Sequence, residues 1–171
     1  MRPALLLLCC LFSTLLGMLY ASRLKSRIRE LKGLERMAML IRQEIAYGRL
    51  PLPDIFGRLG RRMEKPQADF LRALGGELKE HGDTRFEEIF SRQVDACLRT
   101  GNLRQEDLDS LKGMGAYLGY LDRDTQLHTL DMYLRDTQSK IRELSEQYPE
   151  KSRVCRALGI MGGLFLAVLL F

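Results

Sequence analysis

The sequence contains few residues of the types that carry out catalysis, and none of them stands in a recognised catalytic motif. Its two histidines, His81 and His128, lie outside any HExxH pattern, and no serine-centred elbow motif is present. The nucleotide-binding patterns GxxxxGKS/T and GxGxxG are also absent. The sequence therefore predicts a protein that is not an enzyme, with no catalytic residue, no cofactor site and no metal site.

The charged residues that come closest to forming a site have structural explanations. Asp122 and Asp124 flank Arg123 where a helix is expected to begin, and carboxylates at that position cap the first turn without needing a metal. Residues 58–65 hold the one candidate basic cluster for nucleic acid, whereas acidic and basic residues interleave elsewhere. We expect no nucleic acid partner.

The chain that must position any site has three zones. Residues 3–22 and 157–171 contain no charged side chain, and the residues between them are rich in charge. A helix over residues 3–22 is about 30 Å long, which matches the hydrocarbon thickness of a bilayer. We expect residues 1–22 to form an uncleaved transmembrane anchor. A cleaved signal peptide is the alternative, but a cut after Ala21 would place the bulky Leu19 where a small residue is needed.

The C-terminal apolar segment predicts a second transmembrane helix over residues 154–171. Its uncharged part is short for a span, at about 22 Å, but it is apolar on every face and extends by one turn back to Val154. A buried core helix is the alternative interpretation. Small residues at helical spacing in both segments predict close helix packing at Ser13, Gly17, Gly159 and Gly163.

Basic residues next to the two apolar segments give the expected orientation. They are Arg23, Lys25, Arg27 and Arg29 after the first segment, and Lys151, Arg153 and Arg156 before the uncharged part of the second. Because such residues stay on the cytoplasmic side, we expect residues 23–153 to form a cytoplasmic domain between two spans. The net charge of +5 then indicates orientation rather than an acidic ligand.

The cytoplasmic middle has the three- and four-residue spacing of apolar side chains that is typical of helices, without a strand-like alternation of useful length. We expect a compact antiparallel all-α bundle with short connections. The first helix should end at Gly48 in a left-handed cap, and the second should begin with Asp54 as its cap. Further helices are expected from Pro66, from Asp83 or Thr84, over residues 105–117, and from Asp122.

Three stretches carry motifs that are specific in combination. They are MLIRQEIAYGRLPLPDIF (residues 39–56), LKGMGAYLGYLDRDTQ (residues 111–126) and the C-terminal EKSRVCRALGIMGGLFLAVLLF. Through the EIxYGxxPL and LGxxDxxxQ elements, the whole chain resembles the stage III sporulation protein AB family of endospore-forming bacteria. Leu121 is a modest departure, since the family often has a smaller polar residue there.

The resemblance implies a function that the composition does not give. It implies a membrane-anchored structural or assembly platform of the sporulation channel between mother cell and forespore, on the mother-cell side of the outer forespore membrane. The implied partners are other channel membrane proteins, the lipid bilayer and a cytoplasmic secretion-type ATPase, and homo-oligomer formation is left open. The implied fold is similar to the cytoplasmic domain of type II secretion and type IV pilus platform proteins.

Five residues of the shared motifs are candidates for docking a partner: Glu44, Tyr47, Pro51, Asp122 and Gln126. Helix ends and starts explain Pro51 and Asp122 structurally. Glu44 and Gln126 stand at no obvious cap, so they either pair with each other across the bundle or face a partner. Our hypothesis is that the turns at residues 47–53 and 118–126 lie on one surface, away from the membrane or lateral to it.

Two other functional classes remain. A platform subunit of a type II secretion or type IV pilus system is the first, although such proteins usually duplicate the helical domain and this chain shows no internal repeat. A membrane-tethered enzyme is the second, for which the sequence offers no nucleophile, base or metal cluster.

Overall fold

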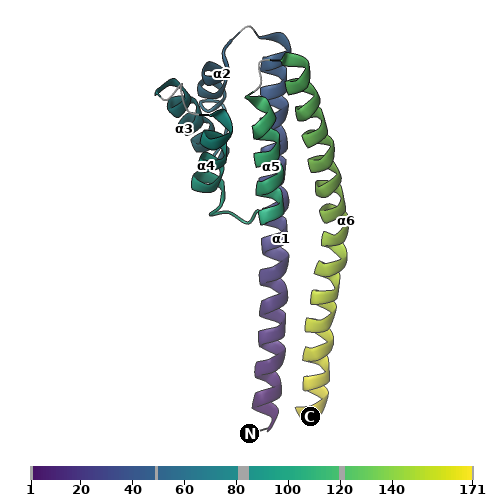
Figure 1. Cartoon of the computed structure of the whole chain (residues 1–171). Coiled ribbons are helices and arrows are strands. Elements are labelled where there is room, and N and C mark those ends of the chain that lie inside the picture. Colours follow the sequence, from purple (N-terminus) through teal and green to yellow (C-terminus); the bar gives the residue numbers. More distant parts are fainter. Residues whose placement is uncertain (1, 49, 81–84, 120–121, 171) are drawn as a thin grey trace. The chain divides into compact units, whose positions relative to one another are not determined.

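The structure is a computed structural model whose elements are all helices. It describes the backbone of residues 2–48, 50–80, 85–119 and 122–170, and the side chains of residues 22–48, 50–80, 85–119 and 122–147. The helices are α1 (Arg2–Tyr47), α2 (Leu52–Leu59), α3 (Gln67–Glu80), α4 (Phe86–Leu98), α5 (Gln105–Leu118) and α6 (Arg123–Leu170) (Figure 1). No strand occurs in the described backbone, so the predicted all-α fold class is confirmed.

The first two helix boundaries differ in detail from the prediction. α1 does end beside Gly48, but no described glycine has a positive φ, so the expected left-handed cap is wrong. The Gly48 N–H instead donates to the Glu44 carbonyl at 2.7 Å, and a Cβ on residue 48 would collide with that oxygen. α2 begins at Leu52 with Pro51 as its N-cap, which places Asp54 inside the first turn. Glycine at 48 therefore permits a close approach rather than an unusual backbone conformation.

The chain divides into two compact units. The paired-helix unit contains Met1–Ile28 and Arg142–Phe171, and the bundle unit contains Arg29–Ile141. Residues of α1 and of α6 belong to both units, whereas α2, α3, α4 and α5 lie wholly in the bundle unit.

The predicted transmembrane segments, residues 1–22 and 154–171, fall in the paired-helix unit. Apart from Ser22, their side chains lie outside those that the structure describes. Within the described residues, no helix offers an apolar stretch of the length needed to cross a bilayer. The two spans, and with them the domain boundaries after residues 22 and 153, stay predictions.

The core of the bundle unit receives side chains from all six helices. In α1 the buried residues recur every three or four positions, at Leu34, Ala38, Ile41 and Ile45, which is the spacing of one helical face. Fully burying a leucine or isoleucine side chain contributes about 1.5–3 kcal/mol. The largest fully buried side chains are Phe56, Phe70, Phe90, Leu34, Met37, Ile41, Ile55, Leu59, Leu71, Leu74, Ile89 and Leu98.

Aromatic rings connect three of the short helices, and a glycine brings the fourth close to them. Phe70 of α3 and Phe90 of α4 meet edge to face, with ring centroids 5.3 Å apart and ring planes at 87°. Phe86 lies 5.8 Å from Phe90 and 6.2 Å from Phe56 of α2, measured between ring centroids. A Cβ on Gly115 of α5 would overlap the Phe90 ring, so α5 can approach α4 only because residue 115 has no side chain.

Candidate docking site

Two segments that are far apart in the sequence meet at one end of the bundle unit, where α1 ends and α6 begins (Figure 1). The guanidinium of Arg123, the first residue of α6, donates a hydrogen bond to the carbonyl of Ala46 in the last turn of α1. Arg42 of α1 also binds both carboxylate oxygens of Asp131 in α6, at 2.5 and 3.1 Å. These contacts fix the start of α6 against the end of α1.

The ion pair between Arg42 and Asp131 perturbs both groups. The hydrogen bond from Arg42 holds the pKa of Asp131 below its usual value, and the positive charges of Arg42, Arg135 and His128 act in the same direction. The same hydrogen bond raises the pKa of Arg42. Both side chains are 37% exposed, so solvent screening makes their net attraction modest.

Asp122 caps the N-terminus of α6, as predicted. Its carboxylate accepts a hydrogen bond from the Thr125 backbone N–H at 2.9 Å and another from the Thr125 hydroxyl. These two hydrogen bonds, the hydroxyl first, lower the pKa of Asp122. The cap satisfies one of the free N–H groups of the first turn and leaves the side chain on the surface, where a partner can reach it.

Glu44 and Gln126 have separate partners inside the bundle unit and do not pair with each other. The Glu44 carboxylate forms an ion pair with Arg58 of α2, and its side chain is only 18% exposed. The buried Gln126 amide donates to the Leu118 carbonyl at 2.7 Å, which satisfies an acceptor in the last turn of α5. Their structural role is to hold the helix ends in place.

Apolar groups are exposed where α1 is followed by α2. Tyr47 is 90% exposed and Leu50 is 43% exposed, and Pro51 also lies on the surface. We call Tyr47, Leu50, Pro51 and Asp122 the tip patch. It retains three of the five predicted docking residues as exposed side chains, whereas Glu44 is only partly exposed and Gln126 is buried.

The residues predicted to pack the two spans cannot be placed against each other. Ser13, Gly17, Gly159 and Gly163 lie outside the residues whose side chains the structure describes. Their packing stays a prediction.

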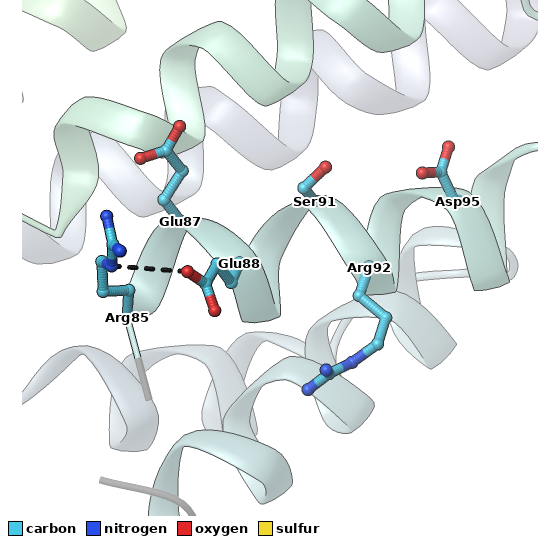
Figure 2. A pocket seen from close by; sticks show the side chains of 6 residues that line it. All are labelled: Arg85, Glu87, Glu88, Ser91, Arg92 and Asp95. Carbon is cyan, nitrogen blue, oxygen red and sulfur yellow. Dashed lines mark ion pairs between the residues drawn. The ribbon is translucent and has the colours of Figure 1, made fainter. Parts of the chain in front are cut away.

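A shallow hollow of about 610 Å³ lies on the outer face of α4. Its lining residues are Arg85, Glu87, Glu88, Ser91, Arg92 and Asp95 (Figure 2). Four of its charged side chains are already paired, since Arg85 pairs with Glu88 at 3.3 Å, Arg92 pairs with Glu77 of α3, and Asp95 binds Lys112 of α5 at 2.7 Å. Glu87 and Glu88 occupy the first turn of α4, where carboxylates interact favourably with the helix dipole. Most of the charges that line the hollow therefore already have partners within the bundle unit.

The described side chains offer no group of three or more His, Cys, Asp or Glu residues that could hold a metal ion. Of the two histidines, His128 lies exposed on α6, and His81 is outside the described residues. Cys97 is a free thiol whose partial burial raises its pKa, which makes it a poor nucleophile.

Sequence reasoning missed the residues that join α1 to α6. Arg42 and Asp131 are 89 residues apart, and Arg123 and Ala46 are 77 apart, so no local spacing marks either pair. A short, exposed motif such as the Asp122 cap is visible in the sequence because its partner is three residues away.

Comparisons with known proteins agree on one family. The model of the family described as Stage III sporulation protein AB matches residues 4–171. The Stage III sporulation protein AB of Bacillus subtilis (strain 168) is 23% identical over 147 residues, which cover 84% of each chain. A solved structure of a Stage III sporulation protein AB superposes with a TM-score of 0.66 at 19% identity, covering 72% of this chain and 97% of that one. At this identity the solved structure shows a shared fold.

Proposed function

Because the chain belongs to the stage III sporulation protein AB family, we propose that it is a membrane-anchored structural component of the sporulation channel between mother cell and forespore. The observation that carries the proposal is the family match over residues 4–171, which includes both apolar ends as well as the bundle unit. The protein acts as an assembly platform, and its work is to hold other components in place.

The anchoring part of the proposal rests on composition. Residues 3–22 and 157–171 are free of charge, and basic residues follow the first segment and precede the second. Two spans with this flanking charge place the bundle unit on the cytoplasmic side, facing the mother cell. A two-span anchor keeps the bundle at the membrane, where other channel membrane proteins are found.

The tip patch is the proposed docking surface for a cytoplasmic secretion-type ATPase. Aromatic residues that protrude from a rigid support are typical anchors of protein interfaces, and Tyr47 is the most exposed of the large hydrophobic side chains in the described bundle. The hydrogen bond between Arg123 and Ala46 fixes the support beneath it. Little conformational freedom is then lost on binding, which favours affinity.

The five docking candidates differ in exposure, which supports two different roles in the proposal. Tyr47, Pro51 and Asp122 contact the partner directly, because they are exposed. Glu44 and Gln126 act through position, since their side chains bind Arg58 and the Leu118 carbonyl.

Co-purification tests the docking surface. The full-length chain is isolated from sporulating cell membranes with either Tyr47→Glu or the control Met132→Glu, which changes a 55% exposed side chain on α6. We expect Tyr47→Glu to lose the ATPase and Met132→Glu to retain it, because a carboxylate in the centre of an apolar contact cannot be desolvated cheaply. Equal recovery of the ATPase with both folded variants would contradict docking at the tip patch.

The alternatives predict different behaviour. A platform subunit of a type II secretion or type IV pilus system would be expressed in vegetative cells beside pilin genes, whereas a sporulation component is expressed in mother cells beside an ATPase gene. A membrane-tethered enzyme would show substrate turnover by the purified full-length protein.

A further inference from the structure

One exposed face of α1 within the bundle unit is basic over its first three positions and neutral over its last two. Arg29, Lys32, Arg36, Met39 and Gln43 are all exposed and recur three or four residues apart, so they form one continuous row along the helix. We call these five residues the α1 row. The opposite side of the same helix carries the buried core positions, so the α1 row is not needed to form the bundle.

The three basic residues of the α1 row have no acidic counterpart on α1. The helix contains three carboxylates, and each is used on another side. Glu30 accepts hydrogen bonds from the Asn102 backbone N–H at 2.9 and 3.0 Å, and Glu35 accepts from the Gln138 amide at 2.9 Å. Glu44 is paired with α2, as described above. None of these groups neutralises the row.

Elsewhere in the bundle unit, many basic residues form an ion pair with an acidic one. The pairs outside α1 are Lys65–Asp69, Arg72–Asp69, Lys79–Asp54, Arg85–Glu88, Arg92–Glu77, Arg104–Glu106, Lys112–Asp95 and Lys140–Asp136. Among the described residues, Arg29, Lys32 and Arg36 form no ion pair and no side-chain hydrogen bond. Like charges at this spacing repel and slightly destabilise the helix, so folding gives no reason for the row.

We propose that the α1 row docks a helix of a partner protein that carries carboxylates at three- and four-residue spacing opposite Arg29, Lys32 and Arg36. Such a helix matches the row in period, and side chains at this spacing can interleave along two packed helices. The row continues into neutral Met39 and Gln43, which suits the apolar contact of a protein helix. A nucleic acid or an anionic lipid surface would attract only the basic residues and would leave Met39 and Gln43 without a role.

The inference stands apart from the proposed function, because it concerns which face makes a contact and what charge the partner carries. It holds whether or not that partner is a sporulation protein. The tip patch and the α1 row can also be disrupted separately, since they share no residue.

Site-specific cross-linking in intact cells tests the proposal with the full chain. A photoreactive amino acid replaces Gln43 at the end of the row, and a second version replaces the exposed Ala96 on α4 as a background control. We expect a protein cross-link at position 43 that maps by mass spectrometry to a segment with Asp or Glu at helical spacing.

Charge variants then decide whether the row carries the contact. The triple change Arg29→Glu, Lys32→Glu and Arg36→Glu should lower the cross-link about tenfold, because three attractive charges become repulsive. The matched control Arg61→Glu, Arg62→Glu and Arg99→Glu changes three other exposed arginines and should leave it unaltered. Replacing the mapped carboxylates with Lys should restore the cross-link of the triple variant.

A neutral version, Arg29→Gln, Lys32→Gln and Arg36→Gln, controls for loss of folding. It should give an intermediate cross-link yield with an unchanged melting temperature. The proposal is overturned if the product is a lipid or a nucleic acid, or if the mapped segment lacks carboxylates. A yield at position 43 no higher than at Ala96, or one insensitive to the triple change, overturns it as well.

Discussion

Gln126 shows how a residue shared with a family motif can serve the fold. Its amide lies 9% exposed beside the end of α5 and donates to the Leu118 carbonyl at 2.7 Å. A buried acceptor that loses its donor costs more than the hydrogen bond contributed, because the group cannot return to water. Glutamine at this motif position is therefore explained by the Leu118 carbonyl at the end of α5, which needs a hydrogen-bond donor.

Replacing Gln126 with Met, which keeps much of the length but removes the amide, should lower the free energy of unfolding by about 1–3 kcal/mol. Chemical denaturation of the full-length protein measures this loss. Ser139→Met, at an exposed position of the same helix, is the control and should change stability little. Equal stability of wild type and Gln126→Met would show that the hydrogen bond contributes nothing.

Asp131 predicts a pH dependence whose direction follows from its lowered pKa. The folded protein binds this proton less readily than the unfolded chain, so the stabilising contribution is complete above the ordinary Asp pKa of about 3.9. It is lost as the pH falls through the lower folded-state pKa. We expect wild type to melt at a higher temperature than Asp131→Asn near neutral pH, with the gap closing in acid. A gap that stays constant from neutral to acidic pH would contradict this assignment.

At the scale of single residues, local partners were predictable and distant ones were not. The Asp122 cap follows from a hydrogen bond to a residue three positions away. Arg42 and Asp131 meet only because α1 and α6 lie side by side in the bundle unit, and that packing leaves no mark in a single sequence. The ion pair of Glu44 with Arg58 of α2 was missed for the same reason.

Helix α5 contains two glycines that occupy opposite environments. Gly115 faces the Phe90 ring, where an added Cβ would overlap the aromatic carbons, whereas Gly113 has nothing within 4 Å of an added Cβ. Glycine in a helix costs about 0.5–1 kcal/mol relative to alanine. Only at residue 115 does close packing against α4 offset that cost.

The two substitutions to alanine should therefore have opposite signs. Gly115→Ala should destabilise the protein by about 1–3 kcal/mol, because α5 and α4 must move apart or Phe90 must leave its preferred rotamer. Gly113→Ala should stabilise it by about 0.5–1 kcal/mol. Thermal denaturation of the pair measures both effects, and a stabilising Gly115→Ala would refute the close approach of the two helices.

At the scale of elements, the period of apolar residues predicted the number and type of helices in the middle of the chain. Helix boundaries were predicted less accurately where two residues could each start a helix. Asp54 is a favourable cap residue, but Pro51 and Pro53 have the fixed backbone angle that starts α2 earlier. Gly48 follows the end of α1 as predicted, although its backbone is not left-handed.

At the scale of the whole molecule, the apolar ends and their basic flanks predict a bundle unit on the cytoplasmic side. A green fluorescent reporter fused after Arg36 should fluoresce, and a reporter that is active only outside the cytoplasm should be silent at the same position. Activity of the second reporter alone would contradict the orientation.

Function could be predicted from the sequence only in part. The sequence carries no recognised catalytic motif, and no pattern of charge or of apolar spacing identifies a cellular process. The process follows from family membership over residues 4–171. The docking surfaces depend on exposure, which only the packed bundle unit displays.

Spore formation by a strain that lacks this gene is the most direct test of the central claim. We predict that heat-resistant spores fall to near background, that forespores arrest at the third stage of development, and that the wild-type gene supplied in the mother cell restores them. The Met132→Glu variant should also restore spores, whereas Tyr47→Glu should not. Normal spore counts in the strain without the gene would contradict the account.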